Sequence, residues 1–258
     1  MITHLAAASS AVRGLITGPS LDGALLGTFS QALIIGTDAG DGPRVLSLLS
    51  PMAARVPNGV LLPEISGFDS LPAGEPVSIG AGHITVGGLH VQVVRWWDCR
   101  VPPTGPSPAA TRALRSAVEG SVRGLPCGPI DDLRRALNSQ GEAVQITAAV
   151  DGLVGLGQGL TPGGDDVLAG VMTGLHATGR TDLAGVIRGR VEELRDRTTQ
   201  LSADLLRLAG DGFGCLEIVG FLQASEAQAA RSIQRLLSIG HTSGADLATG
   251  LVIGLEAL

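Results

Sequence analysis

Short apolar runs separated by turn residues fill the first part of the chain. Six of them have the length and β-branched content of strands and span residues 32–35, 45–49, 60–62, 77–79, 83–86 and 89–94. Gly87 and Gly88 between the last two runs predict a tight hairpin. Residues 1–15 are expected to add a leading helix. The pattern therefore predicts a small, mostly antiparallel β domain over residues 1–103.

Apolar residues recur at helical spacing after residues 101–108, Val-Pro-Pro-Thr-Gly-Pro-Ser-Pro. This segment is a predicted linker, because proline continues neither a strand nor a helix. Helices are expected over residues 111–120, 130–137, 143–153, 165–176, 181–197, 199–208, 212–222, 226–239 and 244–258. The predicted fold class is therefore α+β, with the β domain followed by an all-α domain over residues 104–258.

Two segments of the helical part are similar to each other. Residues 163–174, GGDDVLAGVMTG, align without gaps with residues 243–254, SGADLATGLVIG. Each copy has a loop glycine, an aspartate in the first helical turn, and two glycines four residues apart on one face. Because such glycines let backbones approach closely, we expect the two helices to pack together and to bring their N-termini to one place. Chance similarity in a chain rich in Gly, Ala and Leu is the alternative.

The composition excludes several kinds of chemistry. The net charge of −6 argues against nucleic acid as a partner, since phosphate binding needs a basic face. The chain contains no lysine, which excludes Schiff-base chemistry and a Walker-type phosphate lysine. No apolar run is long enough to cross a membrane. The chain start lacks the pattern of a secretory signal, and the cysteines are scattered, so we expect a cytoplasmic protein.

Residues 155–166, GLGQGLTPGGDD, concentrate glycines directly before a predicted helix. Successive glycines allow positive φ and let amide groups point at a ligand, and a helix start favours an anion. The spacing does not fit a dinucleotide fingerprint, and the lysine of a P-loop is absent. We therefore predict an anion site whose ligand-binding residues include Gly157, Gly159, Thr161, Gly163 and Gly164.

Asp165 and Asp166 have two possible roles at this helix start. One of them can stabilise the helix as an N-cap or first-turn acid. The other can orient a substrate N–H group, accept a proton or hold Mg²⁺. Both are candidate catalytic residues, and so is Asp246, which repeats Asp166 in the second copy. No cofactor or metal centre is predicted, although Mg²⁺ remains possible.

Two more polar clusters precede predicted helices. Thr199 and Ser202 are candidates for ligand contact, and a helix cap is the alternative role. Ser243 and Gly244 in the second copy are further candidate ligand-binding residues. His241 beside them is a candidate catalytic donor or acid near neutral pH, and a solvated loop histidine is equally compatible with the sequence.

Residues 154–170, VGLGQGLTPGGDDVLAG, resemble the signature of a bacterial family that includes the AllH-type subunit of oxamate carbamoyltransferase. The blocks TQLS at 199–202 and GHTSG at 240–244 are similar to other recurring blocks of that family. Gln158 and Gly163 depart from the proline and the serine that are usual there. The resemblance implies transfer of a carbamoyl group from carbamoyl phosphate to oxamate, or the reverse reaction from oxalurate, in allantoin (purine) catabolism.

The expected partners are a small anionic substrate and other protein subunits of the same complex, and an oligomer is possible. Two alternatives come from other functional classes. The first is a non-catalytic subunit that binds a small carboxylate or acts as a scaffold. The second is a Mg²⁺-dependent phosphoryl-transfer enzyme, which rests on the adjacent aspartates alone.

Overall fold

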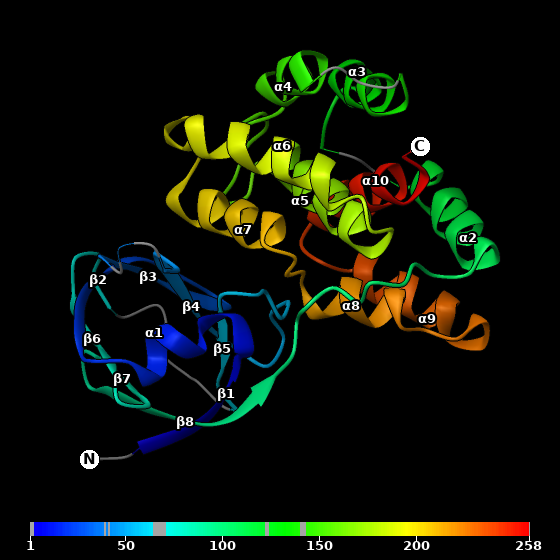
Figure 1. Cartoon of the computed structure of the whole chain (residues 1–258). Helices are drawn as coiled ribbons and strands as arrows, with labels where there is room; N and C mark the ends of the chain where they lie inside the picture. The colour runs from blue at the N-terminus through cyan, green and yellow to red at the C-terminus, as the bar shows by residue number, and fades with distance from the viewer. Residues whose placement is uncertain are drawn as a thin grey trace. The chain divides into compact units, whose positions relative to one another are not determined.

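The computed structural model describes residues 3–257 apart from 39, 41, 64–70, 122–123 and 140–142. The chain divides into two units, Met1–Cys99 and Arg100–Leu258 (Figure 1). The first unit contains strands and the second contains helices, and each is described by itself below.

The strands of the first unit form a closed barrel in the order β1-β5-β4-β3-β2-β6-β7-β8. Their bounds are β1 Thr3–Ser9, β2 Leu21–Phe29, β3 Ala32–Thr37, β4 Val45–Leu49, β5 Gly59–Leu61, β6 Pro76–Gly80, β7 His83–Val86 and β8 Leu89–Trp97. The pairs β1–β8 and β4–β5 are parallel. Between β1 and β2 lie η1 (Ser10–Val12) and α1 (Arg13–Thr17), and α1 lies in front of the barrel opening in Figure 1. Val12 of η1 and Ile16 of α1 are fully buried in the barrel core, so this helical segment closes part of the apolar interior of the barrel.

This architecture corrects the predicted fold class, an α+β protein with a mostly antiparallel β domain followed by an all-α domain. The strands close into a barrel with parallel pairings, and helix α1 lies within the strand segment. The leading helix predicted over residues 1–15 is wrong for residues 3–9, which form β1, whereas residues 10–15 do lie in the helical segments η1 and α1. In β1 Ala6 and Ala8 point into the core while Leu5 is 55% exposed, an alternation typical of a strand. Alanine favours helices only weakly against such tertiary pairing.

The second unit contains helices α2–α10 in its described part. Their bounds are α2 Pro108–Glu119, α3 Cys127–Asn138, α4 Ala143–Asp151, α5 Gly163–Ala177, α6 Thr181–Glu193, α7 Gln200–Gly210, α8 Leu216–Leu222, α9 Glu226–Leu237 and α10 Ser243–Glu256, with the 3₁₀ turn η3 Arg195–Arg197 before α7. Each predicted helix overlaps one of these, and the largest differences are at α6, which ends at Glu193 instead of Arg197, and at α8, which begins at Leu216 instead of Gly212. No helix in the described ranges is long and apolar enough to cross a membrane.

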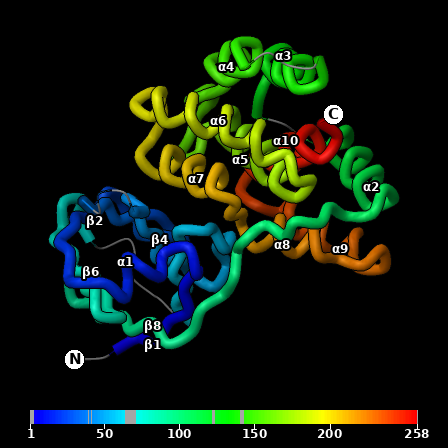
Figure 2. The backbone as a smooth tube through the Cα atoms, in the orientation of Figure 1, coloured from blue at the N-terminus to red at the C-terminus, as the bar shows by residue number. Residues whose placement is uncertain are grey.

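Helices α5 and α10 lie side by side in the middle of this unit (Figure 2). Nearly every residue of α5 is buried, in an apolar cluster that includes residues of α3, α4, α6 and α7. Ala248, Leu251 and Val252 of α10 join a second cluster with α2, α8 and α9, whereas Ile253 of α10 belongs to the first. The pair therefore separates two apolar cores and is covered on both sides.

Glycines allow α5 and α10 to touch through their backbones. A Cβ atom on Gly170 would lie 2.1 Å from the carbonyl oxygen of Leu247, and one on Gly250 would lie 1.9 Å from that of Val167. These contacts are equivalent in the alignment of the two repeats, since Val167 corresponds to Leu247. The close packing predicted from the glycine spacing is thus confirmed, and the two copies make a self-complementary contact.

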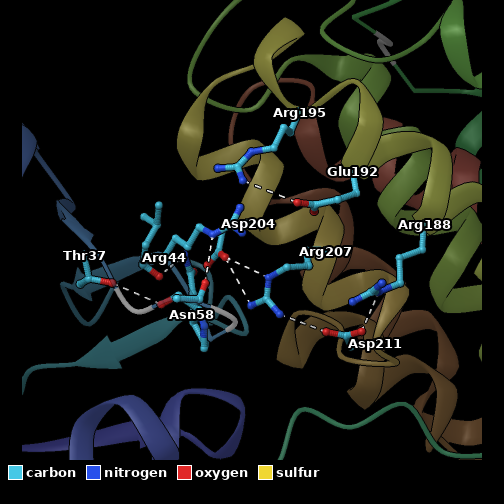
Figure 3. Close-up of polar contacts among 12 residues, drawn as sticks. Thr37, Arg44, Asn58, Arg188, Glu192, Arg195, Asp204, Arg207 and Asp211 are labelled. Carbon is cyan, nitrogen blue, oxygen red and sulfur yellow. Dashed lines mark hydrogen bonds and ion pairs between the residues drawn. The ribbon is translucent and has the colours of Figure 1, made fainter. Parts of the chain in front are cut away.

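A chain of charged side chains joins α6 to α7 (Figure 3). Arg207 donates to Asp204 over 3.3 Å and to Asp211 over 3.1 Å, and Arg188 donates to Asp211 over 2.7 Å. Asp204 is buried, so its contact with Arg207 is better shielded from water than a surface pair. The network helps to fix α7 against α6, and the first turn of α7 reaches the site described next.

Candidate anion-binding site

The first turns of α5 and α10 meet. A Cβ atom on Gly163 would lie 2.8 Å from Asp246 Oδ2, and Thr161 Oγ1 lies 3.4 Å from Ser243 Oγ. At the other end of the pair, Gly174 is in backbone contact with α10. The helices therefore run parallel, and the predicted meeting of their N-termini is confirmed. Two positive helix ends at one place favour a bound anion.

The loop before α5 has the backbone that its glycines predict. Gly155, Gly157 and Gly159 have φ of 74°, 117° and 97°, values at which residues with a side chain are strained. Residues 157–160 are exposed. Thr199 Oγ1 donates to the carbonyl oxygen of Leu160 over 2.6 Å, which ties the loop to the start of α7.

The amides of Gly164 and Gly244 are used within the protein. Gly164 N donates to Leu156 O over 2.8 Å, and Gly244 N donates to Ile239 O over 3.0 Å. A Cβ atom at Gly164 or Gly244 would lie 2.0 or 2.3 Å from a carbonyl oxygen of the preceding backbone. Both glycines pack a helix start against the chain before it. Ligand contact at Gly164 and Gly244 stays a prediction, and it is not supported by their amides, which already donate to carbonyl oxygens of the protein.

Three other amides of the predicted cradle remain unused. In the part of the chain that the structure describes, no acceptor pairs with the amides of Gly157, Gly159 and Gly163. A Cβ atom on Gly159 would meet open space, whereas one on Gly157 would lie 2.8 Å from Gly163 N. The unused amides at residues 157–163 thus belong to the exposed Gly157 and Gly159 and to the buried Gly163.

Asp165 is buried and fully engaged by protein donors. Its carboxylate accepts hydrogen bonds from Gly155 N over 2.8 Å, from Ser202 Oγ over 2.7 Å and from Thr198 Oγ1. Thr199 caps α7 by accepting from Ser202 N over 3.0 Å. Asp165, Thr199 and Ser202, which are candidate site residues, thus connect the loop, α5 and α7. The geometry favours their structural roles over ligand contact.

Asp166 differs from its neighbour because one of its two carboxyl oxygens is left without a donor in the described part of the chain. Its side chain is 7% exposed, and its Oδ2 atom has no hydrogen-bond partner among the described residues. Burial raises the pKa of Asp166 well above its ordinary value, and the charges of Asp246 and Asp165 raise it further. The nearby hydroxyls of Ser243 and Thr161 oppose this rise in pKa. Asp166 is the carboxyl of this cluster that keeps a buried, unpaired oxygen.

Asp246 is fully buried at the start of α10. Its two oxygens lie 3.2 and 3.3 Å from Gly124 N, a donor that the sequence analysis missed. No local pattern could have revealed this pairing, because Gly124 lies in another loop far away in the sequence. A Cβ atom on Gly124 or on Gly163 would lie 2.8 Å from Asp246 Oδ2. Glycine at 163 thus fits the position of Asp246.

His241 is exposed in the turn before α10. Within the described ranges it forms no hydrogen bond or ion pair with the acidic cluster. Its catalytic role remains a prediction. In the same described part, no group of three or more His, Cys, Asp or Glu side chains is arranged to hold a metal ion.

Asp166→Asn is expected to raise the free energy of unfolding at pH 7, by an amount within the roughly 0.5 to 2 kcal/mol that single stabilising substitutions commonly give. Asp166 ionises near pH 4 in the unfolded chain, but its folded pKa is raised. Between those two pKa values the folded state holds more protons, so stability falls as the pH rises. Asparagine removes this loss, and the difference should vanish below about pH 4.

Denaturant unfolding of both proteins at a series of pH values measures this difference in stability. Parallel pH dependences for the wild type and Asp166→Asn would show that Asp166 titrates normally in the folded protein.

No solved structure is significantly similar to the chain. Residues 153–255 match the family model described as oxamate carbamoyltransferase subunit AllH. The match begins before the glycine loop, ends in α10 and does not extend into the barrel. The chain is therefore AllH-like over residues 153–255, which confirms the resemblance stated from the sequence.

Proposed function

We propose that this protein is a subunit of an oxamate carbamoyltransferase-like enzyme and binds a small anionic ligand at residues 157–163. Carbamoyl phosphate, oxamate and oxalurate are the candidate ligands. The observation that carries the proposal is the meeting of two helix N-termini at a loop whose Gly157, Gly159 and Gly163 amides have no acceptor among the described residues. Backbone amides and helix ends suit a chain without lysine.

The proposed reaction fits such a site. Carbamoyl transfer depends on positioning two reactants and on stabilising negative charge, and it needs no covalent nucleophile. The family description names a subunit, which supports an assembly with further protein chains. We further propose that the enzyme acts in the cytoplasm in allantoin catabolism, as the resemblance implies.

A second candidate is a non-catalytic subunit that binds a small carboxylate and completes the active site of a partner. It is favoured by the state of the predicted catalytic residues. Asp165 is engaged by protein donors, and His241 lies outside the hydrogen-bonded cluster. Carbamoyl transfer by the isolated chain would exclude this candidate. The Mg²⁺-dependent alternative is not supported by any group of potential ligands among the described residues.

Calorimetric titration with carbamoyl phosphate, phosphate, oxamate and oxalurate tests the anion site. Gly159→Asp is expected to weaken binding at least tenfold, or by about 1.4 kcal/mol, because it adds a negative charge to the loop. Gly179→Asp is the matched control, since Gly179 is exposed, has a positive φ of 78° as Gly159 has a positive φ, and a Cβ atom there would also meet open space. Thermal unfolding of both variants checks that they fold.

The control should bind as the wild type does. Equal affinity in both variants would remove the loop from the site. Absence of binding by all four compounds, with and without partner subunits, would contradict the proposed function.

A further inference from the structure

The unpaired oxygen of Asp166 needs an explanation. Nine in ten or more buried polar groups have a hydrogen-bond partner, and an unmade bond to a buried oxygen is unfavourable. Asp166 Oδ2 has no partner among the described residues, although the hydroxyls of Thr161 and Ser243 lie nearby. It is located where α5 and α10 begin, on the helix that directly follows the loop with the unused amides. A ligand that completes this bond would relieve the unfavourable state.

The surroundings of Asp166 decide its charge. The charged groups that act on it are Asp165 on its own helix and Asp246 on α10, and both are negative. Together with burial they raise its pKa, which favours a carboxyl that keeps its proton. A protonated carboxyl has one O–H donor and one carbonyl acceptor, whereas a carboxylate only accepts.

We propose that Asp166 recognises the carbamoyl or primary amide group of the ligand as a neutral carboxylic acid. Its O–H donates to the carbonyl oxygen of that group, and its C=O accepts from the amide N–H. The negative end of the same ligand contacts the amides of Gly157, Gly159 and Gly163. This inference rests on the proposed function, and it specifies a ligand in which an amide adjoins a negative charge.

Entry of the ligand requires a local change. Asp166 is 7% exposed, and Thr161 Oγ1 and Ser243 Oγ beside it are 3.4 Å apart. Thr161 follows the exposed residues 157–160, where Gly159 has open space around it. Binding therefore separates Thr161 from Ser243 and brings the amide group of the ligand to Oδ2.

Oxamate and pyruvate are a matched pair of probes. They have the same charge and nearly the same size, and they differ by an amino group in place of a methyl group. The wild type is expected to bind oxamate at least tenfold more tightly than pyruvate at pH 7. Asp166→Asn keeps one donor group and one acceptor, so it should retain this preference within about threefold. Asp166→Leu should bring the ratio of the two affinities close to one.

The protonation state has a readout that needs no ligand. Infrared spectra of the wild type at pH 7 should contain a carboxylic acid band that Asp166→Asn lacks.

The oxamate affinity of the wild type should fall as the pH rises, because the ionised Asp166 carboxylate has no donor and repels the negative ligand. The affinity of Asp166→Asn should change less over the same range. If Asp166→Leu does not fold, the infrared band and the two pH profiles still test the inference.

The outcomes separate this inference from the function on which it rests. Oxamate binding that is retained in Asp166→Leu with an unchanged ratio would overturn the role of Asp166 alone. Loss of oxamate binding in Asp166→Asn, with pyruvate still bound, would also overturn the role of Asp166 as a neutral acid, since an ionised carboxylate would then be required. A wild type that binds neither compound, nor carbamoyl phosphate, contradicts the anion site and this inference with it.

Discussion

Gly250→Ala is expected to lower the free energy of unfolding by about 3 kcal/mol or more, an effect at the upper end for overpacking. The new Cβ atom would lie 1.9 Å from the carbonyl oxygen of Val167 and 2.9 Å from Val171 N. Both atoms belong to the backbone of α5, so no side chain can move aside. Helices α5 and α10 must separate, which disturbs both apolar cores that they join. Denaturant unfolding measures the loss.

Gly185→Ala is the matched control for this substitution. Gly185 is exposed in the middle of α6, and a Cβ atom there would meet nothing within 4 Å. Alanine is the better helix former by about 1 kcal/mol, so this variant should be slightly more stable than the wild type. The two substitutions thus have opposite expected signs. A stabilised Gly250→Ala protein would contradict the backbone contact.

Gly170→Ala extends the test, because it affects the equivalent contact on the other helix. Once one methyl group has separated the helices, the second should cost less. The double variant Gly170→Ala with Gly250→Ala should therefore lose less stability than the sum of the single variants. Additive losses would indicate two independent contacts.

The packing of α5 and α10 could be predicted because the glycine spacing itself encodes it. Glycines four residues apart lie on one helix face, and their repetition in the second copy indicated which helix meets which. Strands such as β4 and β7 were likewise evident from their short apolar runs. These features depend on local patterns, and local patterns are visible in a sequence.

Closure of the barrel could not be predicted in the same way. It depends on the parallel pairing of β1 with β8, which are separated by most of the barrel sequence. β1 has an alanine-rich sequence, and β2 is interrupted by Gly23 and Gly27, so neither has a strong strand pattern. The register of distant strands, and not their individual propensities, determines this part of the fold.

The different roles of Asp165 and Asp166 could not be predicted from the sequence either. The two residues are identical and adjacent, so no sequence pattern distinguishes them. Asp165 faces donors that come from the loop and from α7, whereas Asp166 faces the start of α10. The partners that decide these roles come from distant segments, and only the fold brings them together.

Asp165→Ala is expected to lower the free energy of unfolding by about 3 to 5 kcal/mol, because each buried donor left without an acceptor costs about 1 to 3 kcal/mol. Three donors lose their acceptor at once, namely Gly155 N, Ser202 Oγ and Thr198 Oγ1. Burial makes each unpaired donor unfavourable. The loop then loses its connection to α5 and α7, so anion binding should weaken as well. Denaturant unfolding and oxamate titration measure the two effects.

Asp166→Asn and Ser202→Ala are the control variants for the stability loss expected of Asp165→Ala. The first changes the adjacent carboxyl and should increase stability, so opposite signs are expected at neighbouring identical residues. Ser202→Ala removes a single donor and should cost about 1 to 3 kcal/mol, less than the loss of the carboxylate. In a double variant with Asp165→Ala, the serine substitution should cost little, because its acceptor is already gone. If Ser202→Ala costs as much stability in the Asp165→Ala protein as in the wild type, Ser202 stabilises α7 independently of Asp165. The Asp165 carboxylate would then not be what connects the loop, α5 and α7.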